Sequence, residues 1–493
     1  MNFFDTTFVF VKKLNAFSYL IGLCILAIII RAIGVDSLNL SIEEVEFLYY
    51  SHPSNPLEEL VKVCKNGLPI FDFALYRLWF TLVGFSILKA KCLSFFFNIL
   101  LIPLGYFLSK KISEKESEAR FTAFLITIAL SLIALANNSR FYNELLLFST
   151  LSFYFFLDFL KQKTSASSII LFVVFTTASI LSHYFAVFLF VSQFLIIVFF
   201  FIKNRLTKIQ LLLAFISFLS VTIIVGLVFS SFMYLLKNGN DYLHESSNPL
   251  IVFSHLYIFL GQDPVLFLCC IIMIIIYIKK TTSLKIKTES NYKKTAVLMW
   301  LLFTFIIPTL VDLFYKPIIR RDYHLILLIP LLIFVSWGFG LLQNQWKICV
   351  IILISCSSIV NICFIQNYYH EPENTLYRTP FSFGSLTYEI SKKTVPTPTF
   401  IFATQELSYN FYFKYIWNSN YRATEYIDKI NLLTDEKVFV IKHREELVKD
   451  DNTTNQKIVN NYTLQDSIKI KLESFYVYSR NKKDTTSKKE SLK

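Results

Sequence analysis

Long apolar stretches alternate with short polar loops over most of the chain. A helix needs roughly 20 apolar residues to cross the hydrocarbon core of a bilayer, and these stretches reach or approach that length. We expect crossings at residues 17–33, 92–109, 121–136, 141–160, 168–181, 185–202, 209–235, 265–278, 295–314, 323–342 and 348–364. The pattern predicts an all-α polytopic membrane protein with about eleven transmembrane helices.

Two further apolar stretches are weaker candidates. The stretch 249–261 is short for a crossing. The stretch 68–88 carries Asp72 and Arg77, whose charges would be costly in hydrocarbon. If neither stretch crosses, the Lys- and Arg-rich loops fall on one side, as cytoplasmic loops do. These loops contain Lys12, Lys13, Lys110, Lys111, Lys115, Lys161, Lys163, Lys203, Arg205, Lys208, Lys279, Lys280, Lys285, Lys287, Lys293, Lys294 and Lys347. We therefore predict a cytoplasmic amino terminus and place residues 68–88 along the outer interface.

The composition becomes polar after residue 365. Short β-like runs at 399–403, 437–442 and 469–478 alternate there with helical or turn-like stretches. The predicted organisation is a transmembrane domain (1–365) that includes an acidic first outer loop (35–67) and an interfacial segment (68–88), then an external soluble α/β domain (366–481) and a disordered tail (482–493). The carboxyl-terminal domain would thus be extracytoplasmic.

Composition narrows the class of protein further. The 493 residues are 54% hydrophobic and include 52 Phe, which is far from a soluble average. The net charge of +13 is concentrated in short loops, so it indicates topology and not a nucleic-acid partner. All of the eight cysteines except Cys64 fall in apolar runs, and their spacing predicts neither a disulfide framework nor a metal site. No cofactor is implied, although a divalent cation remains compatible with the sequence.

The first outer loop contains an acidic pair. Ser41-Ile42-Glu43-Glu44 has the spacing of a capping box, in which Ser41 caps a helix and Glu44 reaches back to it. Glu44 then has a structural role, and Glu43 is left near the membrane surface as a candidate general base. A solvated acidic loop is the alternative interpretation.

Several cations fall on the predicted outer side. Arg140 follows the run that ends at 136, although Glu144, one turn later, could simply pair with it. His183 and Tyr184 close the run 168–181. Lys316, Arg320 and Arg321 stand before the run 323–342, where cations are unusual, and an anionic ligand such as a lipid phosphate would explain them.

These features occur in the order that is found in GT-C membrane glycosyltransferases. The chain most resembles the glycosyltransferase family 39 group: the protein O-mannosyltransferases, the lipid A aminoarabinose transferase and the galacturonosyl transferases of lipopolysaccharide. The resemblance covers about residues 17–364 and, loosely, the tail. In the first part of the chain, Leu40-Ser41-Ile42-Glu43-Glu44 stands where the family has its acidic pair, Leu68-Pro69-Ile70-Phe71-Asp72-Phe73 where it has His-Pro-Pro-Leu-Tyr-Tyr, and Gly84 with Lys91-Cys92-Leu93-Ser94 where it has Gly and Arg-x-x-Ser. Further along, Asn138-Ser139-Arg140-Phe141-Tyr142 resembles the family's Glu-Ala-Arg-x-Tyr, and Arg321-Asp322-Tyr323 resembles its Arg-Tyr. The motif Ser182-His183-Tyr184-Phe185-Ala186 is the closest match.

The resemblance implies a function. The donor would be a polyprenyl-phosphate-linked sugar, and the acceptor a lipid, glycan or protein on the extracytoplasmic face of a multi-pass protein of the bacterial inner membrane. Glu43 would be the base of an inverting transfer. The implied phosphate ligands are Arg140, Lys316, Arg320 and Arg321, and the implied pocket residues are Pro69, Tyr142, His183, Tyr184 and Tyr323. No metal is implied.

Three positions depart from the family pattern. Glu43 replaces Asp, Leu68 replaces His, and Asn138 replaces Glu. These departures leave a catalytically inactive homologue as an alternative. A transporter or flippase of lipid-linked saccharides is another, but it would need ionisable residues inside its spans. Asp158 and Asp312 lie near span ends, so the sequence predicts an interior almost free of charge.

Overall fold

The protein divides into two units in its structure, a computed structural model. The described residues are 15–33, 40–65, 70–161, 165–228, 257–258, 260, 262–281, 289–314, 325–365, 383–392, 399–402, 406–419, 421–424, 437–443, 462–470 and 473–480. Met1–Val35 and Tyr50–Pro372 form one unit, called here the transmembrane unit. Asp36–Tyr49 and Glu373–Lys493 form the other, called here the C-terminal unit.

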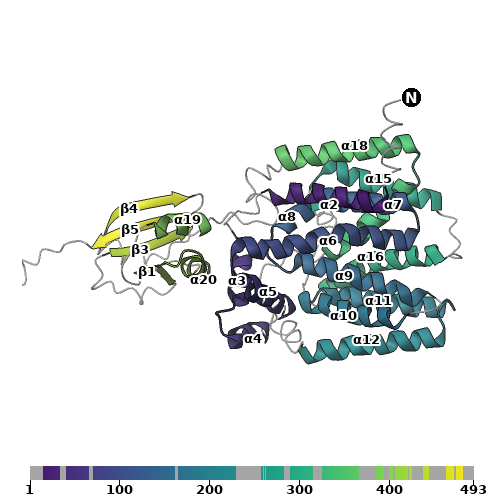
Figure 1. Ribbon diagram of the computed structural model, residues 1–493, viewed down its shortest axis with the longest axis horizontal. Coiled ribbons are helices and arrows are strands. Elements are labelled where there is room, and N and C mark those ends of the chain that lie inside the picture. Colours follow the sequence, from purple (N-terminus) through teal and green to yellow (C-terminus); the bar gives the residue numbers. More distant parts are fainter. Residues whose placement is uncertain are drawn as a thin grey trace, which may run out of the picture. The chain divides into compact units, whose positions relative to one another are not determined.

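Helices make up the transmembrane unit, and Figure 1 shows many of them running side by side. Each of the apolar runs that we expect to cross coincides, within the described residues, with one helix or with two successive helices. The helices are α2 (Ala16–Ala32), α4 (Leu57–Lys65), α5 (Ile70–Val83), α6 (Ile87–Ser113), α7 (Glu116–Ile128), α8 (Leu130–Ala136), α9 (Tyr142–Phe156) with η1 (Leu157–Leu160), α10 (Ala166–Ser182), α11 (Ala186–Ile202), α12 (Lys208–Val228), α15 (Pro264–Thr281), α16 (Glu289–Phe314), α17 (Leu328–Gly340) and α18 (Asn344–Val360) with η3 (Asn361–Ile365).

Several of the described helices can cross a membrane. Five are long and apolar enough alone, and the bent pair α7 and α8 would make a sixth. Four more apolar helices are shorter, namely Ala16–Ala32, Ala166–Ser182, Ala186–Ile202 and Leu325–Gly340. The predicted all-helical polytopic membrane fold is therefore confirmed, whereas the number of about eleven crossings stays a prediction.

The break between α7 and α8 bends the chain by 57°. A break inside a membrane frees backbone carbonyls that water cannot reach. Arg31, at the end of α2, satisfies two of them: its guanidinium donates to the carbonyls of Thr127 and Ile126, each at 2.9 Å. Arg31 is fully buried. It thus caps the broken helix from a neighbouring one.

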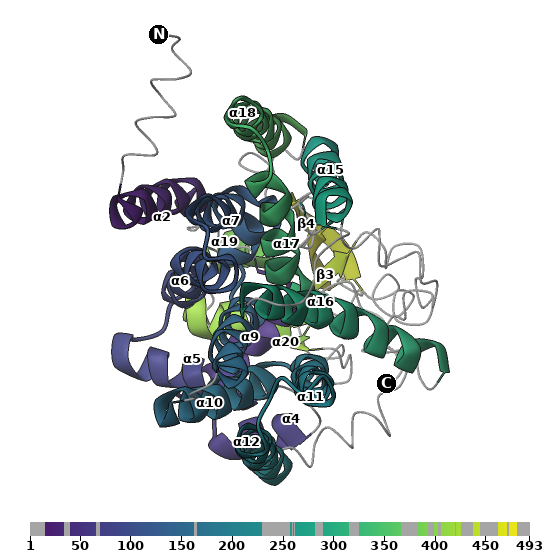
Figure 2. The same ribbon diagram turned by 90° about the vertical axis from the view of Figure 1, so that its right-hand side faces the viewer.

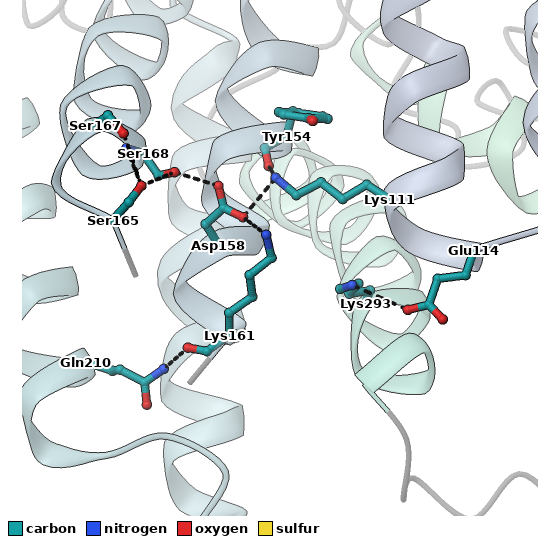
Figure 3. A network of polar contacts seen from close by, with 10 residues as sticks. All are labelled: Lys111, Glu114, Tyr154, Asp158, Lys161, Ser165, Ser167, Ser168, Gln210 and Lys293. Atoms are coloured by element: carbon teal, nitrogen blue, oxygen red, sulfur yellow. Dashed lines mark hydrogen bonds and ion pairs between the residues drawn. The ribbon is translucent and has the colours of Figure 1, made fainter. Parts of the chain in front are cut away.

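Figure 2 views many of these helices end-on. A polar network at the ends of α6, α9 and α10 is drawn in Figure 3. Asp158, after α9, pairs with Lys111 of α6 at 3.0 Å and with Lys161 at 2.6 Å. Ser168, in the first turn of α10, donates to Asp158 at 2.7 Å. The loops that the sequence assigns to one membrane side thus meet at one end of the bundle. Which side of the membrane this end faces stays a prediction.

The almost charge-free interior of the spans stays a prediction, but charged side chains are buried near the ends of several helices. Arg31 on α2 and Glu144 on α9 are both fully buried. Glu118, on α7, is buried beside Lys294, with 3.9 Å between their nitrogen and oxygen atoms. The distance of a charge from the end of an apolar run does not show whether a neighbouring helix covers it.

The described part of the C-terminal unit contains a sheet of five strands. The strands are β1 (Thr399–Phe402), β2 (Tyr421–Thr424), β3 (Lys437–His443), β4 (Tyr462–Ile470) and β5 (Glu473–Arg480), in the order β2-β1-β3-β5-β4. β1 is parallel to β2 and β3, whereas β5 is antiparallel to β3 and β4. The predicted single run at 469–478 is wrong, because it includes the end of β4 and the start of β5, which are two antiparallel strands.

The C-terminal unit also contains helical segments. They are α19 (Phe383–Ser391), α20 (Glu406–Phe411) and η5 (Tyr412–Ile416). Most of α3 (Ile42–Ser51), which is distant in sequence, also belongs to this unit. Residues 36–49 therefore belong with the C-terminal unit and not with the transmembrane unit.

Candidate active site

Buried hydrogen bonds hold the turn that precedes α9. Asn98 of α6 accepts from Arg31 Nε at 2.7 Å and donates to Asn143 Oδ1 at 2.8 Å. Asn143 donates to Ser94 Oγ at 2.6 Å, and Ser94 donates to the Asn138 carbonyl at 2.5 Å. In a low-dielectric interior such a connected network strongly favours one arrangement. The backbone of the turn is thus fixed to α6.

Arg140 extends from this turn with its guanidinium against two aromatic rings. Its Cζ lies 5.1 Å from the Phe141 ring centroid and 5.0 Å from that of Tyr142. Arg140 is half-buried and Tyr142 is buried. Cation–π contacts of this kind are favourable, and more so where water is excluded. They orient a planar group whose N–H donors match the oxygens of a phosphate.

His183 follows the last residue of α10 and stacks on two rings. Its imidazole centroid is 4.8 Å from that of Phe141 and 4.5 Å from that of Tyr184. Its Nδ1 accepts from the backbone N–H of Phe185 at 3.2 Å. In the neutral ring the proton is therefore on Nε2.

Phe141 joins these two groups, since its ring contacts both the Arg140 guanidinium and the His183 imidazole. The structure thus brings together four residues that the sequence proposed for a site: Arg140, Tyr142, His183 and Tyr184. Phe141 itself was missed. It occupies the variable position of the Arg-x-Tyr pattern, which gave no signal.

A buried carboxylate lies next to this group. Ser182, the last residue of α10, donates to Asp72 Oδ1 at 2.9 Å. Burial raises the pKa of Asp72 well above its usual range, and the nearby Glu144 carboxylate raises this pKa further. The hydrogen bond from Ser182 acts in the opposite direction and lowers the pKa. Asp72 is therefore neutral over a wider range of pH than an exposed aspartate.

Glu144 lies between this carboxylate and the start of α9. It is fully buried, has the Tyr76 side chain as a neighbour, and accepts no hydrogen bond at either carboxylate oxygen in the described part of the chain. Of the ion pairs among the described residues, none joins Glu144 to Arg140, although their spacing allows one. The simple-pair interpretation of these two residues is thus wrong.

The acidic pair belongs to the C-terminal unit. The predicted capping box is confirmed: Ser41 N donates to Glu44 Oε2 at 3.0 Å, and Glu44 N donates to Ser41 Oγ at 3.2 Å. Glu44 is buried and Glu43 is half-exposed. In the part of the chain that the structure describes, no hydrogen bond or ion pair engages the Glu43 carboxylate. Its direction is therefore set by the backbone of α3.

Other predicted site residues lie outside the described residues. They are Pro69, Lys316, Arg320, Arg321 and Tyr323. No group of three or more metal-ligating side chains occurs among the residues that are described. Asp72, Ser182 and Asn98 are further parts of the site that the sequence did not predict. Polar residues within apolar stretches were the signal for all three.

The fold is of the GT-C type, which solved structures share. No protein-family model matches the chain, and no curated protein matches it in sequence. Solved structures do match. The apo structure of ArnT from Cupriavidus metallidurans has a TM-score of 0.60 at 9% identity, with 94% of this chain and 98% of that chain covered.

The same ArnT bound to undecaprenyl phosphate has a TM-score of 0.61 at 10% identity, with 95% of this chain and 99% of that chain covered. The likeness thus extends over nearly the whole of both chains. At this identity it establishes the fold, and the residues of this chain must carry any argument about activity.

Proposed function

We propose that this protein is a membrane glycosyltransferase that uses a polyprenyl-phosphate-linked sugar as donor. The observation that supports this proposal is the fixed placement of Arg140 and His183 around Phe141 at one end of the helices. An arginine held by aromatic rings suits a lipid phosphate. ArnT, which shares the fold, has been solved with undecaprenyl phosphate.

In the proposed reaction Glu43 removes the proton from an acceptor hydroxyl or amine. The acceptor attacks the anomeric carbon, and the bond from that carbon to the phosphate oxygen breaks. Arg140 stabilises the charge that develops on the departing polyprenyl phosphate. Direct displacement inverts the anomeric centre. His183 and Tyr184 shape the donor pocket with Tyr142.

The residues outside the described part of the chain keep their proposed roles. Lys316, Arg320 and Arg321 would add to the phosphate site, and Pro69 and Tyr323 would line the pocket. The acceptor is a lipid, glycan or protein on the extracytoplasmic face of the membrane. The setting would be a bacterial inner membrane, with membrane lipids as the surrounding partners.

Transfer in vesicles tests this function. Wild-type protein should move label from a radiolabelled polyprenyl-phosphate sugar to an acceptor in a cell-envelope extract. Glu43→Gln should lower the rate by about 10²–10⁴-fold, because it removes a base and little volume. Glu44→Gln should have a smaller effect, since Gln can also close a capping box. Near-normal turnover of Glu43→Gln at saturating substrate would contradict the assignment of the base.

One observation favours a second function, the transport of a lipid-linked saccharide. Asp72 and Glu144 form a buried carboxyl pair, and buried ionisable groups are typical of transporters. A fluorescent polyprenyl-phosphate sugar in the inner leaflet distinguishes the two. Its appearance outside without loss of its sugar would support transport, and neither transfer nor movement would support an inactive homologue.

A further inference from the structure

The segment that carries Glu43 is attached to the C-terminal unit at both of its ends. Leu40 N donates to the Tyr412 hydroxyl at 3.1 Å. The Tyr49 ring packs edge-on against that of Tyr415, with centroids 5.9 Å apart and an interplanar angle of 67°. Leu40 is 2% exposed and Tyr412 is fully buried. These contacts link residues more than 360 positions apart in the chain.

The contact at Leu40 fixes the direction in which α3 begins. Leu40 N is bonded to Tyr412, and the next backbone N–H, that of Ser41, is bonded to Glu44. Two successive backbone N–H groups before the helix are therefore both engaged. Glu43 lies in the first turn that follows, so its Cα–Cβ direction depends on them.

The buried face of α3 strengthens this attachment. Val45, Phe47 and Leu48 are buried, each with 4% or less of its surface exposed. Glu43 remains half-exposed on the same helix. A helix that is held by a buried face directs its other face in a fixed direction.

We infer that Tyr412 is a positioning residue for Glu43, so that the C-terminal unit holds the base in place. This inference rests on the proposed function, in which Glu43 deprotonates the acceptor. Tyr412 does not touch the substrate in this scheme. It acts through the Leu40 N–H and the first turn of α3.

Hydrogen exchange of the full-length protein in detergent tests the structural step. Tyr412→Phe removes the accepting hydroxyl and keeps the ring, so exchange should become faster in peptides that cover residues 40–45. Tyr421→Phe is a matched control, because Tyr421 is also buried in the C-terminal unit and packs against Phe413. Unchanged exchange in Tyr412→Phe, or equal acceleration in Tyr421→Phe, would overturn the inference.

Transfer kinetics test the functional step. Tyr412→Phe should lower kcat by roughly 3–10-fold, the worth of one neutral hydrogen bond, with the KM for the donor unchanged. The same substitution should have no further effect in a Glu43→Gln background, since Tyr412 acts through Glu43. Faster exchange with an unchanged kcat, or an additive loss in the double variant, would overturn the inference. If wild-type protein shows no transfer, the proposed function fails, and the exchange result still reports the attachment of α3.

Discussion

Ser182 Oγ lies 2.9 Å from Asp72 Oδ1, and this hydrogen bond joins α5 to the end of α10 that carries His183. Both side chains are fully buried. Glu144, from the start of α9, contributes a second carboxylate nearby. Three helices thus meet through polar groups directly beside the proposed phosphate site. Changes in the protonation of Asp72 should therefore affect both stability and the site.

Asp72→Asn should make stability less sensitive to pH. An unfolded aspartate titrates near pH 4, whereas burial and Glu144 raise the pKa of Asp72 in the folded protein. As pH rises between these two pKa values, the unfolded state loses a proton that the folded state keeps, so the free energy of unfolding falls. Asparagine cannot ionise and can still accept from Ser182. The variant should therefore gain stability relative to wild type as pH rises.

Thermal unfolding in detergent from about pH 5 to about pH 9 measures this effect. Glu58→Gln is the control, because Glu58 is an exposed carboxylate on α4. Its unfolding temperature should follow that of wild type at every pH. Parallel curves for wild type and Asp72→Asn would contradict the raised pKa.

Asn98→Leu should destabilise the protein and displace Arg140. The amide of Asn98 accepts from Arg31 and donates to Asn143, and both partners would lose a bond in a buried setting. An orphaned buried polar group costs about 1–3 kcal/mol, and more for a charged one. The unfolding temperature should fall by several degrees. Asn344→Leu, at an exposed position of α18, should change it little.

Gly338→Ala should separate α15 from α17. A Cβ atom at Gly338 would overlap the backbone of Met273, and a backbone cannot move aside as a side chain can. Overpacking of this kind typically costs about 1–3 kcal/mol. Gly22→Ala is the matched control, since a Cβ there would meet nothing within 4 Å. Equal unfolding temperatures for the two variants would contradict the close approach.

The apolar pattern predicted the helices of the transmembrane unit well, because each crossing needs a continuous apolar run. Ser41 and Glu44 also form their predicted bonds, since a capping box depends on four consecutive residues. Local patterns of this kind can be recognised in a single sequence.

Long-range relationships were not predictable in the same way. The bond from Leu40 to Tyr412 joins α3 to a domain that follows the last predicted crossing, and no local pattern indicates it. Likewise, Arg31 caps a helix from 95 positions away. Asp72 was noted as costly in hydrocarbon, but its neighbours Ser182 and Glu144 emerge only once α5, α9 and α10 are placed together.

Arg140→Gln should weaken the binding of polyprenyl phosphate. A hydrogen bond to a charged group contributes about 1.5–3 kcal/mol, which corresponds to roughly a 10- to 100-fold higher Kd. Arg140→Lys should fall between this variant and wild type, because lysine keeps the charge but loses the planar fork and its fit to Phe141 and Tyr142. Equilibrium binding of undecaprenyl phosphate to the detergent-solubilised protein measures both.

The matched control for this substitution is Arg205→Gln. Arg205 also stacks on an aromatic ring, with its Cζ 5.1 Å from the centroid of Tyr292, but it lies in the loop after α11. His183 stands just before α11, so this helix separates the two arginines. If the loss of any stacked arginine were enough to weaken binding, both variants would bind polyprenyl phosphate equally weakly. A loss confined to Arg140→Gln would place the phosphate at the end where Arg140 and His183 meet, whereas unchanged binding in that variant would remove Arg140 from the proposed site.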